Sequence, residues 1–409
     1  MQKSNEVIYQ IFPRNHSLEG NFISIISDLP RIKELGVDII YLMPINEIGQ
    51  KNRKGKWGSP YASKDYFSIS SDLGALDDFQ RLCQEIHKLG MKIILDMVFN
   101  HTAPDNVLLI QHPEFYFYRN GKLGNRVGDW SDIVDLDLDR VDTQNYLISV
   151  LQYWIKQGVD GFRFDVATMI PIDFFNRARQ ELGKQVIFLA ESIDTSFFNW
   201  LVSQGFYATK DQNMIPTFDS LYNYHWFRQF EEYLKYGNSL QPVVDVLNTP
   251  SEILRVNCLE NHDNDRIAFL FNNDERRLRN VLAFIFFLPG CPFIYAGQEY
   301  GASHKPELFE KDPINWNVRN ENIYRFIKLL INLKHKDSNK ELDSIKVSLF
   351  DKDGLKIEKG NLIGLFNFGN KPFSLDIGND KYMNLLGNNI VNGQNISLSE
   401  PLILKKNEN

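Results

Sequence analysis

The sequence predicts an α/β protein built on a closed (β/α)8 TIM barrel, with a short insertion after strand 3 and a C-terminal all-β domain. Two observations indicate this fold. Short β-rich runs alternate with helix-like segments along most of the chain, which is typical of parallel strands joined by crossover helices. The number of such strands approaches eight, and this favours a closed barrel over an open doubly wound sheet.

The expected strands are short runs rich in β-branched and aromatic residues. They lie at Val7–Phe12, Val37–Met43, Met91–Asp96, Gly161–Asp165, Val186–Glu191, Ile253–Leu259 and Pro292–Ala296. One further strand is poorly marked, and we expect it between Gly205 and Thr217. The intervening helices show apolar residues at helical spacing and end next to a glycine, a common C-terminal signal. They are expected at Ile23–Leu35, Leu76–Leu89, Tyr146–Gln157 and Phe174–Leu182.

Two segments interrupt the alternation. The stretch 102–140 holds prolines, glycines and a run of acids but no long helix, so we expect a small insertion over the barrel mouth. The second break lies near Ser338, and turns such as Asp353-Gly354 and Asn392-Gly393 indicate short strands after it. The predicted domains are the barrel (1–101 and 141–337), the insertion (102–140) and a C-terminal β-sandwich (338–409).

Composition narrows the classes of partner. The net charge is −7 and the sequence has no basic stripe, which argues against nucleic acid or an anionic membrane and favours a neutral polar ligand. The most apolar run, Val281–Leu288, is too short to span a bilayer. No signal peptide is recognisable, and three cysteines without metal spacing indicate reduced, buried thiols. We therefore expect a cytoplasmic protein, and its oligomeric state stays open.

Charged and polar residues follow four of the apolar strands. They occur in the segments DMVFNH (Asp96, Asn100, His101), GFRFDVA (Arg163, Asp165), FLAES (Glu191) and LENHDNDR (His262, Asp263). Burying such groups is costly, so their repeated presence at strand ends needs a reason. The carboxyl ends of the strands in a (β/α)8 barrel meet at one mouth, where enzymes with this fold place their active sites.

The spacing of these residues predicts their chemistry. Because side chains alternate along a strand, Arg163 and Asp165 point the same way, and the guanidinium is expected to lower the pKa of Asp165. An ionised carboxylate suits a nucleophile. Glu191 ends an apolar strand, where burial favours the protonated form that a general acid needs. A pair of carboxyls in opposite protonation states is what glycoside hydrolysis requires.

Each of these residues also has a structural interpretation. A single Arg–Asp pair is more often a structural ion pair, a single strand-end glutamate a rim residue, and a single histidine a satisfied core group. Several such residues at the strand ends of one barrel favour the functional interpretation.

Taken in order, the four segments resemble the conserved regions of the α-amylase family of glycoside hydrolases, family 13. GVDIIYLMPI, WGSPYASKDY and GCPFIYAGQEYG also resemble flanking regions of that family, over about residues 5 to 335. The resemblance implies retention of configuration at the anomeric carbon through a covalent glycosyl-enzyme. It assigns Asp165 as nucleophile, Glu191 as acid/base and Asp263 as transition-state stabiliser.

The resemblance also implies contacts with the sugar. The residues expected to bind it are Tyr61, Asp96, His101, Arg163 and His262, and Trp200 is a further stacking candidate, for which core packing is the alternative. No cofactor is expected for the chemistry. A structural Ca²⁺ held by Asn100 and Asp137 is one interpretation of the acidic run 129–139; the other is that these acids are solvated or cap helices.

Departures from the family pattern affect the expected substrate. Thr168-Met169 stand where many α-amylases have Lys-His, and Ala62 stands where exo-acting α-glucosidases often have Asp, which suggests a more open cleft. We expect hydrolysis of mainly α-1,4 bonds in maltodextrins and starch-type oligosaccharides. The alternatives are a family transglycosylase or isomerase, of the glucanotransferase or trehalose-forming type, and a non-catalytic carbohydrate-binding relative.

Overall fold

The computed structural model describes residues 5–128, 130–336 and 344–406. The chain divides into two compact units: Ile8–Tyr222 with Pro306–Asn315, and Asn223–Lys305 with the chain from Trp316 onward. The predicted boundary between residues 337 and 338 lies outside the described residues. The domain limits expected from the sequence therefore stay a prediction.

A closed barrel of eight strands confirms the predicted fold class. The strands follow one another around the barrel in chain order: β1 (Ile8–Ile11), β2 (Ile39–Leu42), β5 (Lys92–Met97), β10 (Gly161–Phe164), β11 (Ile187–Ala190), β12 (Ser220–Tyr222), β13 (Leu254–Asn257) and β14 (Cys291–Tyr295). β1 to β12 belong to the first unit, and β13 and β14 to the second.

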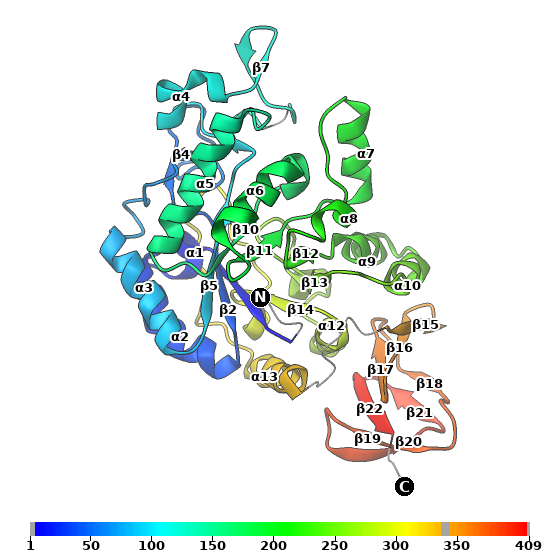
Figure 1. Ribbon diagram of the computed structural model, residues 1–409. Coiled ribbons are helices and arrows are strands. Elements are labelled where there is room, and N and C mark those ends of the chain that lie inside the picture. Colours follow the sequence, from blue (N-terminus) through cyan, green and yellow to red (C-terminus); the bar gives the residue numbers. More distant parts are fainter. Residues whose placement is uncertain (1–4, 129, 337–343, 407–409) are drawn as a thin grey trace. The chain divides into compact units, whose positions relative to one another are not determined.

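In the first unit, amphipathic helices lie outside the parallel strands (Figure 1). The helices are α1 (Pro13–His16), α2 (Phe22–Leu35), α3 (Leu76–Lys88), α5 (Val141–Lys156) and α6 (Ile172–Leu182). Gly36 ends α2 at φ 108°, where a residue with a side chain would be strained. Gly161 opens β10 for a different reason: a Cβ there would lie 2.4 Å from the carbonyl oxygen of Ile187 in β11. Glycine is therefore required for these two strands to pair.

The poorly marked strand lies outside the predicted window. It is β12, Ser220–Tyr222, whereas the stretch 205–217 holds the short helix α8 (Asp211–Met214). Leu189 pairs with Ser220 and Ala190 with Leu221, so β12 is fixed by its register with β11. A strand of three buried residues is too short to show a periodicity, which explains the error.

The predicted insertion after the third barrel strand is built of short elements. β6 (His101–Thr102) pairs with β9 (Val134–Asp135), and between them lie α4 (Val107–Gln111), η1 (Pro113–Phe115) and the hairpin of β7 (Tyr118–Arg119) and β8 (Lys122–Leu123). Figure 1 shows α4 and β7 together at one end of the first unit. A second small hairpin pairs β3 (Glu47–Ile48) with β4 (Ser63–Asp65).

The second unit continues the alternation of strands and helices. Its helices are α9 (Tyr224–Tyr236), α10 (Gln241–Leu247), α11 (Ile267–Leu270), α12 (Glu275–Phe287), η3 (Gln298–Tyr300) and α13 (Glu321–Lys336). α12 contains most of the apolar run predicted at 281–288 and buries it. Among the helices in the described part of the chain, none has the length and apolarity of a membrane span.

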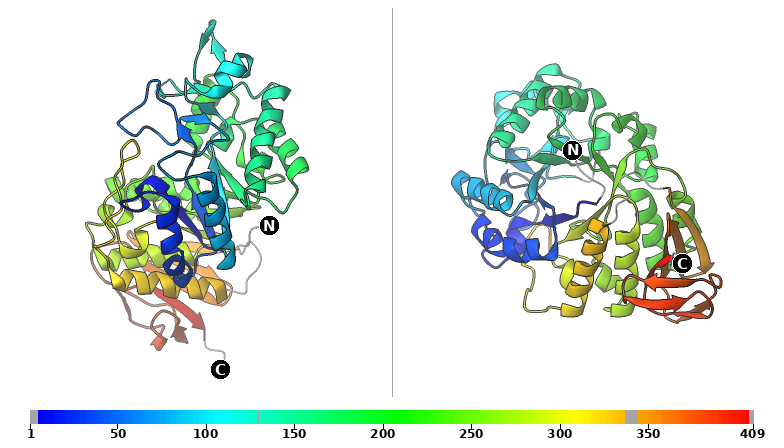
Figure 2. Two further views of the ribbon diagram at one scale, coloured as in Figure 1. Left: turned by 90° about the vertical axis from the view of Figure 1, so that its left-hand side faces the viewer. Right: turned by 60° about the horizontal axis from the view of Figure 1, so that its bottom comes forward.

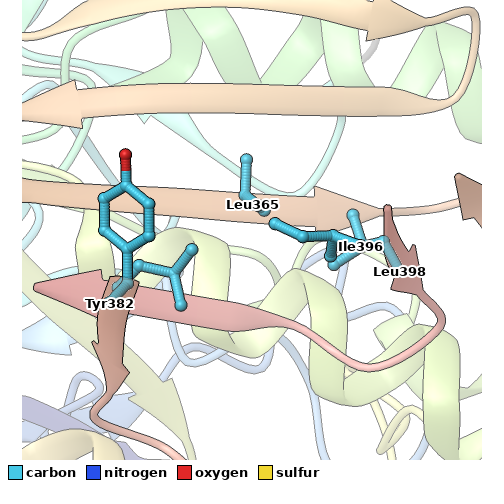
Figure 3. Close-up of a cluster of buried hydrophobic side chains, with 5 residues drawn as sticks. Leu365, Tyr382, Ile396 and Leu398 are labelled. Atoms are coloured by element: carbon cyan, nitrogen blue, oxygen red, sulfur yellow. The ribbon is translucent and has the colours of Figure 1, made fainter. Parts of the chain in front are cut away.

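The C-terminal part of the second unit is all β, as predicted (orange and red in Figures 1 and 2). β15 (Lys346–Asp351), β16 (Gly354–Lys359), β17 (Leu362–Asn367), β22 (Leu402–Lys406), β19 (Lys381–Asn384) and β20 (Asn389–Asn392) form one sheet in that order. β18 (Phe373–Leu375) and β21 (Ile396–Leu398) form a two-stranded sheet. Figure 3 shows their common core, in which Ile396 and Leu398 lie against Leu365 and Tyr382 of the larger sheet.

Candidate active site

One guanidinium holds three carboxyl groups in the first unit. Arg163 lies in β10 with its side chain fully buried, opposite Asp96 of β5 in the strand register. Its Nη1 donates to Asp96 Oδ1 at 2.7 Å and to Asp165 Oδ1 at 2.9 Å. Its Nη2 makes an ion-pair contact of 2.8 Å with Glu191 Oε1. The structure therefore brings together four residues that the sequence singled out.

Two tyrosine hydroxyls complete the surroundings of Asp96. Tyr41 donates to its Oδ2 at 2.6 Å, and Tyr61 donates to the same oxygen at 2.9 Å. Burial raises the pKa of both hydroxyls well above the ordinary value, so both stay protonated donors. The sequence indicated Tyr61 but missed Tyr41, which stands near the end of a predicted strand. It also missed Tyr222, which lies in the strand that was predicted at the wrong position. The ring of Tyr222 lies 5.7 Å from the Arg163 guanidinium.

A single backbone amide links Asp165 to Glu191. The N–H of Val166, the next residue after Asp165, donates to Glu191 Oε2 at 2.8 Å. Val166 has φ 37° and ψ 46°, a left-handed conformation that β-branched residues rarely adopt. Such strain persists only where the surrounding structure enforces it, and it is concentrated at functional sites. Here the strained turn directs the amide at the second carboxyl.

The expected direction of the pKa shift of Asp165 is wrong. Burial raises the pKa of Asp165 well above its ordinary value; Arg163 opposes this, while Glu191 and Asp96 raise the pKa further. One positive charge faces three carboxyls, so it cannot hold all of them ionised away from water. The prediction considered the Arg163–Asp165 pair alone and left out the burial of Asp165 and the other two acids.

His101 lies beside this cluster in the first unit. It is 5% exposed, and its ring lies 5.5 Å from the ring of Trp130 in the insertion. Burial lowers the pKa of His101 to about 4, although Asp132 opposes the shift. His101 is therefore a neutral hydrogen-bonding group near pH 7.

The second unit holds the other two predicted residues. His262 follows β13 and is buried, and its Nε2 lies 3.2 Å from Asp263 Oδ2. Half of the Asp263 side chain is exposed. Its backbone is fixed on both sides, because its N–H donates to Asn261 Oδ1 and its carbonyl accepts from Lys305 Nζ at 2.6 Å.

The insertion does not hold Asn100 and Asp137 as a metal pair. Asp135, not Asp137, lies beside Asn100, with 3.4 Å between its Oδ1 and the Asn100 amide nitrogen. Asp137 instead accepts the N–H of Asp139. The cause is the β6–β9 register, which places Asp135 opposite His101.

Arg126 supplies the positive charge next to Asp135, where a calcium ion would otherwise have to supply it. Arg126 donates to Asp135 Oδ2 from its backbone N–H at 2.8 Å and from its guanidinium at 3.0 Å. Asn100 Oδ1 is buried without a hydrogen-bond partner among the described residues, but calcium takes roughly six to eight oxygen ligands. In the described part of the chain, no three His, Cys, Asp or Glu side chains could hold a metal ion. These residues do not fit a calcium ion.

The residues at the departures from the family pattern are buried. Ala62 packs against Ala103 and Ile133 of the insertion. Met169 packs against Leu201 of α7 (Thr195–Ser203), the helix that follows Glu191. Trp200 lies in α7 and is 39% exposed, so it is not a core residue.

Known proteins resemble the chain over most of its length. The family model described as alpha amylase, catalytic domain, matches residues 5–124, 126–189 and 210–346. The stretch 190–209, which includes α7, lies outside this match. An alpha-amylase from Lactobacillus plantarum, known as a crystal structure, is 37% identical with a TM-score of 0.91, and 98% of each chain is covered.

Two curated relatives are more distant. Neopullulanase 2 of Thermoactinomyces vulgaris is 27% identical over 79% of this chain, and the intracellular maltogenic amylase of Bacillus subtilis is 26% identical over 79%. The chain spans 57% and 56% of the length of these two proteins. With a family model that matches most of its residues around an eight-stranded barrel, the chain belongs to the alpha-amylase catalytic-domain family.

Proposed function

We propose that the protein is a retaining glycosidase that hydrolyses α-glucosidic bonds, mainly α-1,4, in maltodextrins and starch-type oligosaccharides. The observation that carries the proposal is the contact of one buried guanidinium with Asp96, Asp165 and Glu191. Family membership and the 37% identical alpha-amylase support the substrate class.

The reaction proceeds in two displacement steps at the same anomeric carbon. In the first, an Asp165 oxygen attacks the anomeric carbon while Glu191 gives its proton to the departing glycosidic oxygen. In the second, Glu191 takes a proton from water, the water oxygen attacks the same carbon, and the Asp165 ester bond breaks. Two inversions leave the configuration retained. Neither step uses a cofactor.

Charge crowding prepares the site for these proton movements. With three acids around one guanidinium, burial and mutual repulsion favour keeping a proton within the cluster. Burial raises the pKa of Asp165, and Glu191 and Asp96 raise it further, which supports sharing of a proton among these acids. Catalysis requires the proton on Glu191, and attack by Asp165 neutralises the nucleophile's charge as the new bond forms.

The remaining polar residues bind and orient the sugar. Asp96 and Tyr61 form a hydrogen-bonded pair beside Arg163, and neutral His101 can donate to a hydroxyl group. The family resemblance assigns a hydrogen bond from His262 and gives Asp263 the stabilisation of the positive charge that develops on the sugar. The three free, buried cysteines support action in a reducing compartment such as the cytoplasm.

Product analysis with substitutions tests the proposal. Wild-type protein incubated with maltoheptaose is expected to release shorter maltooligosaccharides with new reducing ends of α configuration, seen by NMR. Glu191→Gln is expected to lower turnover by about 10³-fold or more. Near wild-type turnover of this variant would remove the acid/base assignment. Products longer than the substrate, without new reducing ends, would identify a transferase instead.

A further inference from the structure

Three side chains donate hydrogen bonds to Asp96. Its Oδ1 accepts from Arg163 Nη1 at 2.7 Å, and its Oδ2 accepts from the hydroxyls of Tyr41 at 2.6 Å and Tyr61 at 2.9 Å. Among the described residues, Asp165 has a single donor to its side chain, Arg163. Hydrogen bonds to the ionised form of a carboxyl favour that form. Asp96 is therefore held in the ionised form more firmly than Asp165.

Tyr41 and Tyr61 approach the same oxygen from different kinds of structure. Tyr41 belongs to β2 and is fully buried. It stands opposite Ile94 of β5 in the strand register, and side-chain alternation places Ile94 and Asp96 on the same side of the sheet. Tyr61 lies on the loop before β4, is half-buried and is expected to contact the sugar. Of the two hydroxyls, that of Tyr41 is therefore fixed independently of the substrate.

Arg163 is the positive charge at the centre of the cluster. Among the described residues, the titratable groups that face Asp96 or this guanidinium include Tyr41 of β2, Tyr61 of the loop before β4, Asp165 after β10, Glu191 after β11 and Tyr222 of β12. Burial raises the pKa of Tyr41 and of Tyr61 well above the ordinary value, so both keep their protons near neutral pH. The carboxyls are the groups that exchange a proton there, and a donor to one of them affects where the proton resides.

We propose that Tyr41 is a positioning residue of the proposed active site. Its hydroxyl keeps Asp96 ionised and fixed against Arg163. A proton held by the cluster then resides on Asp165 or Glu191. This inference rests on the proposed function, in which Glu191 must carry that proton before the glycosidic bond breaks. Tyr41 is fully buried and acts through Asp96, so it takes no part in the chemical step itself.

The substitution Tyr41→Phe tests the proposal, because it removes the hydroxyl and keeps the ring. A hydrogen bond to a charged group is worth about tenfold or more in an equilibrium constant. Without this bond, Asp96 competes for the proton and fewer molecules carry the proton on Glu191. The value of kcat/KM for maltoheptaose at the optimum pH is therefore expected to fall about tenfold.

The pH profile separates this role from a purely structural one. Because the three acids titrate together, a stronger proton acceptor at Asp96 raises the proton affinity of the whole cluster. Both limbs of the profile of kcat/KM against pH are therefore expected to move to higher pH, by about half a unit to one unit. A loss of packing alone would lower the rate and leave both limbs in place.

Tyr116→Phe is the matched control. Tyr116 lies in the same unit and is 2% exposed, and its hydroxyl forms a hydrogen bond of 3.0 Å with the hydroxyl of Thr102 instead of a carboxyl. This variant loses a buried hydroxyl just as Tyr41→Phe does. It is expected to leave kcat/KM and both limbs of the pH profile unchanged, because its hydroxyl has no contact with the three acids.

A potentiometric titration of the free protein separates this inference from the proposed function, because it requires no substrate. Near neutral pH, Tyr41→Phe is expected to bind a fraction of one proton more per chain than wild type. This excess should vanish in an Asp96→Asn background, where the acceptor is gone. If wild-type protein hydrolyses no glucan, the proposed function fails, and the titration still tests the role of Tyr41.

Limbs that stay in place or move to lower pH in Tyr41→Phe would overturn the inference. So would a rate or a proton count equal to that of wild type. A variant that does not fold would overturn it as well, since Tyr41 would then have a structural role.

Discussion

Arg163 and Arg266 are both fully buried, but they have different surroundings. Arg163, in the first unit, contacts three carboxyl groups. Arg266, in the second unit, pairs with the single carboxylate of Glu260 at 2.8 Å. The second oxygen of Glu260 accepts the Ile267 N–H at 2.7 Å, and the Arg266 guanidinium also donates to the carbonyl of Ala296 at 2.8 Å.

The difference indicates a structural role for the Arg266–Glu260 pair and a chemical role for the cluster around Arg163. Around Arg266 one carboxylate pairs with the guanidinium and both of its oxygens have donors, as expected of a pair that holds its neighbours together, although burial and then the nearby Glu299 raise the pKa of Glu260. Around Arg163 three carboxyl groups face one positive charge, and the backbone of the nearby Val166 is strained. An unfavourable arrangement of this kind is retained where function needs it. Two experiments test this distinction, and two more test how burial acts on His101 and Asp135.

The largest effect is expected from Asp165→Asn. Loss of the proposed nucleophile should lower turnover of maltoheptaose by about 10³-fold to 10⁴-fold. The melting temperature should stay level or rise, because the substitution removes one of three crowded carboxyls. Calorimetry and reducing-sugar assays measure the two quantities. Asp139→Asn, at an exposed acid of the insertion, is the control for activity. A marked fall in the melting temperature of Asp165→Asn would contradict the comparison.

Glu260→Gln, unlike Asp165→Asn, should act mainly on stability. It leaves the Arg266 charge buried without a counterion, so the free energy of unfolding should fall by about 3–5 kcal/mol. Urea unfolding at neutral pH measures this loss. Stability equal to that of wild type would show that the Arg266–Glu260 pair does not have the structural role assigned to it.

The next largest effect concerns acid stability. Burial lowers the pKa of His101 to about 4 from its ordinary 6.5, so the unfolded chain binds this proton more readily than the folded one. The contribution of His101 to stability is complete above pH 6.5 and is lost as the pH falls toward 4, amounting to about 3 kcal/mol. His101→Gln should flatten stability across that window. The exposed His112, changed to Gln, should not.

The smallest effect is expected at the insertion. Chelator should leave the wild-type melting temperature unchanged, because Arg126 supplies the charge next to Asp135. Arg126→Ala should lower the free energy of unfolding by about 1–3 kcal/mol at pH 7, by removing a donor from a buried carboxylate. Burial raises the pKa of Asp135 to about 6, so the loss should shrink near pH 5, where Asp135 is protonated. A wild-type protein destabilised by chelator would restore the calcium interpretation.

Sequence patterns predicted the parts of the molecule that depend on regular geometry. Alternation along β10 placed Arg163 and Asp165 on one side, and the structure confirms their contact. The barrel and the all-β C-terminus followed from strand alternation and turn residues. β12 was misplaced because three buried residues carry too little pattern.

The errors in the candidate site have a common cause, which is that they depend on several groups at once. The pKa of Asp165 is raised first by burial and then by two acids that oppose Arg163, and one of these acids comes from β5, far away in the sequence. The acid beside Asn100 is chosen by the β6–β9 register, which a run of alternating acids does not reveal. Neither fact can be inferred from one strand alone.

The left-handed Val166 has a consequence for attempts to redesign the protein. The amide that holds Glu191 belongs to the peptide group formed by Asp165 itself, and a peptide group is planar and stiff. The two proposed catalytic carboxyls are thus both tied to one planar peptide group: Asp165 is part of it, and Glu191 accepts its N–H. A substitution that reorients this peptide group to suit a new nucleophile at position 165 would also move the N–H that holds Glu191. The two residues therefore have to be exchanged together.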